Sequence, residues 1–158
     1  MGDFKRKHPK LIAFFTYYQM LGGLLGLMIT FILLKNPSSD IEYVGEFIAQ
    51  TVAFCLSFYC GYQFLNKANR AAIDWSIFSH LLQLLQFKVG GFYYLFVSGS
   101  GFFKTLQGSP TNNTTTLSIS KFRLEVASLD APDYFSLNLI AVLMLILLII
   151  LKIAYAKK

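Results

Sequence analysis

The stretch from Leu11 to Leu34 contains 24 consecutive residues without a charged side chain. As a helix it would be about 36 Å long, which is enough to cross a hydrocarbon core of about 30 Å with some tilt. The whole chain shares this character, because 55% of its 158 residues are hydrophobic and only 14% are charged. A soluble domain carries roughly 25% charged residues. The sequence therefore predicts an integral membrane protein and argues against an ordinary soluble enzyme.

Three more apolar runs follow the first, and polar segments separate them. We expect membrane crossings at 11–34, 47–65, 71–88 and 134–153. The remaining segments are a basic N-terminus (1–10), a loop (35–46), a short basic loop (66–70), a long insert (89–133) and a basic tail (154–158). The third run is the weakest, because it contains Asp74, His80 and two glutamines. We count it as a crossing, since without it the basic C-terminus would lie on the opposite side from the N-terminus.

The insert at 89–133 has a different character from the apolar runs. Glycine, serine and proline punctuate short aromatic and β-branched stretches, and residues 122–126 alternate between apolar and charged side chains. This alternation is typical of strands, so we expect two to four of them. Open strands cannot lie bare in lipid, so we place the insert outside the hydrocarbon core or against other protein. The predicted fold class is mainly α, with four transmembrane helices and a small β-rich extracytoplasmic insert between the third and fourth.

The cations of the chain indicate its orientation in the membrane. The formal net charge is +6. The basic residues that flank the apolar runs are Lys5, Arg6, Lys7, Lys10, Lys67, Arg70, Lys157 and Lys158. With four crossings, all of them fall on one side, which the positive-inside rule makes the cytoplasm. We therefore interpret the charge as topological and attractive to anionic lipid, and we expect no nucleic-acid partner.

Small residues on the first two runs predict close helix packing. Gly22 and Gly26 form a GxxxG pattern, and Gly61 lies on a polar seam of the second run. In lipid, such residues allow a neighbouring helix to approach closely. The partner helix could belong to this chain or to a second copy.

His80 is the most informative single residue, because an ionisable group within a membrane segment is a functional hypothesis by default. The candidate polar site consists of His80, Gln83, Gln50 and Gln19. The preferred interpretation is that a neutral His80 bonds to a glutamine or a carbonyl and holds helices together. A site for a proton or a small polar ligand is the alternative. A metal site is disfavoured, because His80 has no second histidine, glutamate or cysteine at ligand spacing.

The sequence contains no recognisable catalytic pattern. It lacks a Ser/His/Asp set in one compartment, a phosphate loop ending in G-K-[ST], and H-E-x-x-H. We therefore assign no catalytic, cofactor-binding or metal-binding residue, and we expect no cofactor and no enzymatic activity.

One part of the chain also shows a resemblance to other proteins. The stretch Leu81-Leu82-Gln83-Leu84-Leu85-Gln86-Phe87, followed by Val89-Gly90-Gly91-Phe92 and Val97-Ser98-Gly99, resembles a family of small four-helix bacterial membrane proteins to which no function is assigned. The resemblance covers roughly the last two thirds of the chain. It implies a location in a bacterial inner (plasma) membrane, and it assigns no functional role to any residue of this chain.

The leading functional hypothesis is a non-enzymatic multi-pass membrane protein. Its outer β insert and polar helix seam would contact lipid, another membrane protein or a second copy of the chain. The alternative is a small transporter, or a protein that binds a ligand or a proton at a site centred on His80.

Overall fold

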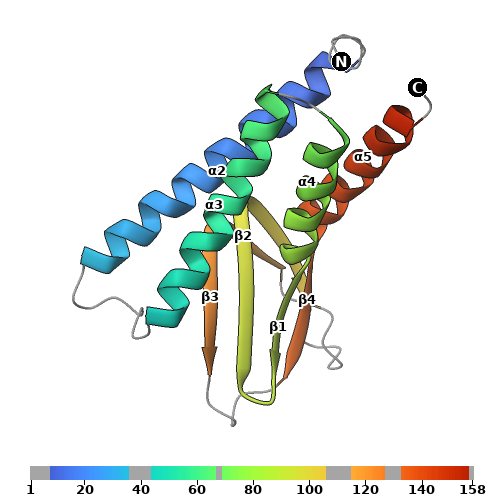
Figure 1. Ribbon diagram of the computed structural model, residues 1–158. Helices are drawn as coiled ribbons and strands as arrows, with labels where there is room; N and C mark the ends of the chain where they lie inside the picture. Colours follow the sequence, from blue (N-terminus) through green and yellow to red (C-terminus); the bar gives the residue numbers. More distant parts are fainter. Residues whose placement is uncertain (1–7, 36–43, 67–68, 106–114, 127–132, 157–158) are drawn as a thin grey trace.

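The computed structural model describes residues 8–35, 44–66, 69–105, 115–126 and 133–156, and within these ranges it contains four helices and four strands (Figure 1). The helices are α2 (Pro9–Lys35), α3 (Val44–Asn66), α4 (Arg70–Leu82) and α5 (Leu139–Ala156). The strands are β1 (Leu85–Val89), β2 (Phe92–Thr105), β3 (Thr115–Val126) and β4 (Tyr134–Asn138). The predicted combination of helices with a β-rich region between the third and the fourth is therefore found.

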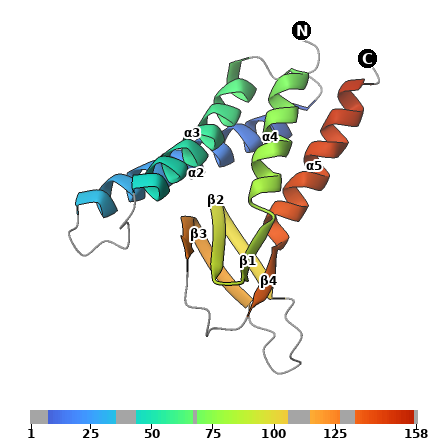
Figure 2. The same ribbon diagram turned by 60° about the horizontal axis from the view of Figure 1, so that its bottom comes forward.

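The helices form two antiparallel pairs. Helices α2 and α3 make one pair, and α4 and α5 make the other, with Asp74 of α4 bonded to Lys152 of α5 at 2.7 Å. The start of α2 and the end of α5 lie at the same end of the molecule, and the sheet lies at the other (Figure 1). Figure 2 shows α2 and α3 running obliquely to α4 and α5. One apolar core cluster joins all four helices: Ile12, Phe15, Phe64, Ala72, Ile73, Met144, Leu148 and Leu151.

The four strands form one antiparallel sheet in the order β1-β4-β2-β3, and β1 also pairs with β2. The turn between β1 and β2 consists of Gly90 and Gly91, which both have positive φ. Two such residues match the tight hairpin turn that glycine favours. Strand β2 has a register irregularity between Val97 and Ser100. Its first residues pair with β1 and its last residues pair with β4, so β2 bends over between them. We call the bend at residues 97–100, with the facing residue Ser120 of β3, the apex of the sheet.

The sheet exposes large apolar side chains and buries polar ones beside a small apolar core. Its enclosed side holds a small core of Leu95, Val97 and Phe103. Polar residues buried in the strands are Lys88, Ser98, Thr105, Ser120, Ser136 and Asn138. Large apolar residues exposed on the strands are Leu85, Val89, Phe92, Phe102, Leu117, Ile119 and Phe135. A sheet in water shows the opposite arrangement, with polar side chains outside.

Two predicted helical crossings are wrong in part. The segment 71–88 is helical only to Leu82, and residues 85–88 belong to β1. The segment 134–153 begins with strand β4 and becomes helical at Leu139. The β region consequently extends beyond the predicted 89–133 on both sides. The physical reason is a period-two alternation at 85–89 and 134–138, where side chains that face out of the sheet alternate with side chains that face into it.

Three helices, α2, α3 and α5, are long and apolar enough to cross a membrane. Helix α4 has 13 residues, which corresponds to about 20 Å and is less than a hydrocarbon core of about 30 Å.

Candidate functional site

The apex of the sheet contacts the middle of α2. A Cβ atom on Gly22 would lie 2.5 Å from the backbone nitrogen of Gly99, so only glycine fits at this position. The Ser120 hydroxyl donates to the carbonyl oxygen of Gly22 at 3.1 Å and accepts from the Gly99 N–H at 3.1 Å. The Tyr18 hydroxyl, one turn earlier on α2, donates to the carbonyl oxygen of Ser100 at 2.9 Å. Gly22 therefore packs against a strand, whereas the GxxxG pattern predicted a helix as its partner.

The other two predicted packing glycines do lie between helices. A Cβ on Gly26 would lie 2.1 Å from the ring of Phe54 on α3. A Cβ on Gly61 would lie 2.7 Å from the carbonyl oxygen of Thr16 on α2. Both glycines allow α2 and α3 of the same chain to approach closely.

Two of the four predicted polar residues, Gln19 and His80, lie where α2 faces α4. The Ser76 hydroxyl donates to Oε1 of Gln19 at 3.1 Å, and both residues are fully buried. His80 lies one turn after Ser76 and is 1% exposed. Its ring centroid is 6.1 Å from that of Tyr18 and 6.4 Å from that of Phe15. Gln19 and His80 therefore belong to one buried cluster on facing helices.

This cluster contains unused hydrogen-bonding capacity. Among the described residues, neither ring nitrogen of His80 has a hydrogen-bond partner, and neither does Nε2 of Gln19. Buried polar groups are normally paired, and unpaired ones indicate an internal water, an ion or a functional group. The structure therefore does not show the hydrogen bond from His80 to a glutamine or a carbonyl that the preferred interpretation requires.

Gln83 has a structural role that was not predicted from the sequence. It ends α4, its Oε1 accepts from the Ser98 N–H at 2.9 Å, and its Nε2 donates to the Ser79 carbonyl at 3.3 Å. Asn138 bonds to the Gln83 carbonyl from its Nδ2 at 3.2 Å. The Oδ1 atom of Asn138 accepts from the N–H groups of Phe102, Ile140 and Ala141, so this residue caps α5. Gln83 and Asn138 fix the ends of two helices to the sheet.

Gln50 lies apart from the cluster. It lines a cavity of about 250 Å³ between α2, α3 and β3, which we call the outer pocket. The lining residues are Ile29, Leu33, Glu46, Gln50, Ile119, Ser120, Lys121, Phe122 and Arg123. His80 is not among them. The predicted four-residue site is therefore divided, with Gln50 in the outer pocket and the other three residues on the α4 side.

The outer pocket combines an apolar wall with charged groups. Ile29 and Leu33 of α2 form one side, and β3 brings Lys121 and Arg123 to the other. Oε1 of Glu46 accepts from the Leu124 N–H at 3.1 Å. Such a lining suits an amphiphilic surface, such as a lipid or the mixed side chains of a partner protein.

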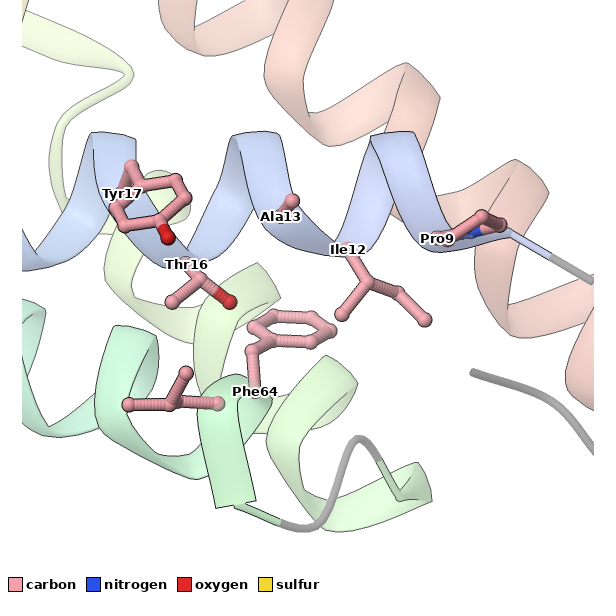
Figure 3. A pocket seen from close by; sticks show the side chains of 7 residues that line it. Pro9, Ile12, Ala13, Thr16, Tyr17 and Phe64 are labelled. Carbon is pink, nitrogen blue, oxygen red and sulfur yellow. The ribbon is translucent and has the colours of Figure 1, made fainter. Parts of the chain in front are cut away.

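A second cavity, of about 190 Å³, lies between α2 and α3 near the start of α2 (Figure 3). Figure 3 shows Phe64 of α3 reaching toward Ile12 and Thr16 of α2. The remaining lining residues are Pro9, Ala13, Tyr17 and Leu65. This lining offers little chemistry, because most of it is apolar.

The described residues include only two of the eight predicted topology charges. Lys10 is on the first turn of α2 and Arg70 begins α4, at the end of the molecule that also holds the end of α5 (Figure 1). Arg70 lies 3.8 Å from Asp74. The others, Lys5, Arg6, Lys7, Lys67, Lys157 and Lys158, lie outside the described residues.

Comparisons with known proteins add no identity. No protein-family model, no curated protein and no solved structure matches the chain. The resemblance to small bacterial membrane proteins remains a prediction. Within the described residues, no group of three or more His, Cys, Asp or Glu could hold a metal ion.

Proposed function

We propose that this chain is a non-enzymatic integral membrane protein that binds a partner through its β element. Four crossings would place both termini in the cytoplasm of a bacterium and the β element on the outer side of its inner membrane. Three helices with the length and apolarity of membrane spans support insertion. The common end shared by the start of α2 and the end of α5 supports an even number of crossings.

The outer pocket is the observation on which the proposed binding role depends. Here the helices and the β element bring charged and apolar groups together around one cavity. The polar seam is less available to a partner, because Tyr18, Ser76 and Gln19 bond within the chain. The partner that we propose is another membrane protein or a second copy of this chain.

Site-specific photocrosslinking in membranes tests this role. A photoreactive amino acid replaces Lys121 in the outer pocket, and the same replacement at Lys104, an exposed lysine on β2 outside the pocket, is the control. The proposal expects one adduct of defined mass from position 121 and none of that mass from position 104. Identical crosslinking patterns from both positions would refute a role for the pocket.

A second candidate function, binding of a proton or a small polar ligand near His80, has one observation in its favour. The unpartnered nitrogens of His80 and Gln19 lie in one buried cluster. This role requires His80, so His80→Leu should abolish any pH-dependent transport by the reconstituted protein. Transport that is unchanged in this variant, or that is independent of pH, would exclude it.

A further inference from the structure

We infer that the sheet lies within the outer leaflet of the bilayer, so that lipid acyl chains contact its outer face. This inference rests on the proposed membrane crossing, and it concerns a surface that the sequence placed outside the hydrocarbon core or against other protein. The first observation is the depth of the apex. Gly22 is in the middle of the 27-residue helix α2, and the apex of the sheet contacts it. If α2 crosses the membrane, the apex lies near the bilayer centre, and the rest of the sheet extends from there toward the outer surface.

The lengths of the crossings lead to the same conclusion. The 13 residues of α4 provide about 20 Å, which does not span a core of about 30 Å. Strand β1 starts three residues after α4 ends, and its five residues add about 16 Å. On the return, β4 continues directly into α5 at Asn138–Leu139. Helix and strand together match the thickness of the core, whereas α4 alone does not.

The outer face of the sheet has the composition of a lipid-facing surface. Ile119, next to the apex, is 61% exposed, and Phe135 on β4 is 50% exposed. The rings of Phe92 and Phe135 each lie 6.1 Å from that of Phe87, which forms an aromatic cluster far from the apex. Aromatic side chains are typical of the headgroup level, and aliphatic ones of the acyl-chain level. Apolar side chains on the exposed face are also the pattern of membrane β-barrels.

A strand in lipid requires partners for its backbone groups, and two strands of the sheet have them on both sides. Strands β1 and β4 are each hydrogen-bonded on two sides, since both pair with β2 and with each other. At the open edge of β3, the Leu124 N–H is bonded to Glu46 of α3, and the Ser120 side chain holds the strand against α2.

The exposed lysines of the described part of the sheet are Lys104 and Lys121. Lys104 is five residues from Gly99, so its flexible stem can cross apolar surface and bring the ammonium group to the headgroups. Lys121 lies next to the apex, where it lines the outer pocket together with Glu46.

Fluorescence quenching in vesicles tests the inference. Trp75 is the single tryptophan of the chain, so Trp75→Phe gives a background without tryptophan. Ile119→Trp, Phe135→Trp and, as a reference on α5, Ile146→Trp are then introduced one at a time. Each protein is reconstituted in phosphatidylcholine vesicles whose acyl chains carry bromine at defined depths. Aqueous iodide is the complementary quencher.

The inference predicts that brominated acyl chains remove most of the Ile119→Trp fluorescence and that iodide removes little. Phe135→Trp should respond best to the shallowest bromines. Should Ile119→Trp prevent folding, Phe102→Trp replaces it as a second outer position near the apex. If bromolipid quenches Ile146→Trp while only iodide quenches Ile119→Trp, the sheet is in water and the inference is wrong, although the crossing stands. If no bromolipid quenches Ile146→Trp, the proposed crossing fails as well.

Discussion

The hydroxyl of Ser120 donates a hydrogen bond of 3.1 Å to the carbonyl oxygen of Gly22, a residue 98 positions earlier in the chain. The same hydroxyl accepts from the backbone of Gly99. One side chain therefore joins strands β2 and β3 to helix α2. Ser120 is also the one described residue other than glycine with positive φ, at 38°.

Two substitutions at Ser120 separate the hydroxyl from the backbone conformation. Ser120→Ala removes two hydrogen bonds, so the Gly22 carbonyl oxygen and the Gly99 N–H lose this partner. We expect a loss of about 1–3 kcal/mol in the free energy of unfolding. The alanine keeps a Cβ atom at positive φ. Ser120→Gly loses the same bonds but relieves the backbone, and should be less destabilising. Denaturation in detergent micelles measures both variants. Ser118→Ala on the same strand is the control, and equal losses at positions 118 and 120 would contradict the role of Ser120.

The close approach of α2 and α3 makes Gly61 sensitive to a single methyl group. In Gly61→Ala the new Cβ would meet the backbone of Thr16 and Met20, which cannot move without separating the helices, so we expect a loss of about 1–3 kcal/mol. Gly45→Ala on the same helix is the matched control, because a Cβ there has no atom within 4 Å. Thermal unfolding of the purified variants should show a lower Tm for Gly61→Ala only. A Tm for Gly61→Ala as high as that of Gly45→Ala would show that the helices are not so close.

His80 and Gln83 should respond in opposite directions to the same substitution. His80→Leu removes two buried nitrogens that have no partner among the described residues, so we expect equal or greater stability. Gln83→Leu removes the acceptor of the Ser98 N–H and should cost about 1–3 kcal/mol. Unfolding curves of the two variants and of the wild type, measured under the same conditions, check both expectations. A large loss in His80→Leu would show that the ring is hydrogen-bonded, for instance to an internal water.

Asn138 should be the most sensitive residue at the junction of β4 and α5. Asn138→Ala leaves three backbone N–H groups without their acceptor and removes the bond to Gln83. Loss of an N-cap alone costs about 0.5–2 kcal/mol, and we expect a larger loss here because the site is buried. Asn66→Ala, at the exposed end of α3, is the control. A variant of Asn138 that unfolds like wild type would contradict this account of the junction.

The sequence predicted the apolar character of two segments better than their secondary structure. Hydropathy identified 71–88 and 134–153 because it measures apolarity over a window and does not depend on backbone conformation. The alternation of Leu85, Phe87 and Val89 with Gln86 and Lys88 was a strand signal at the end of the first segment. It was visible in the sequence, but the low charge of the segment favoured a helix.

The candidate site was predicted less well, because residue type does not report depth or pairing. Counting the helical rise separates part of the site. Gln19 and His80 both lie about 15 Å from the starts of their helices, whereas Gln50 lies about 24 Å from the C-terminal end of α3. The division of the site was therefore accessible from the sequence. The roles of Gln83, Asn138 and Ser120 were not, because each depends on contacts with strands that are distant along the chain.

Cysteine accessibility tests the membrane topology most directly. In a background of Cys55→Ala and Cys60→Ala, single cysteines replace Pro9, Val44 or Ala156, and spheroplasts are treated with a membrane-impermeant maleimide. Val44→Cys should react in intact spheroplasts, since Val44 begins α3 and is 76% exposed. Pro9→Cys and Ala156→Cys should react only after permeabilisation. Labelling of Ala156→Cys but not Pro9→Cys in intact spheroplasts would place the two ends on opposite sides and contradict the four crossings.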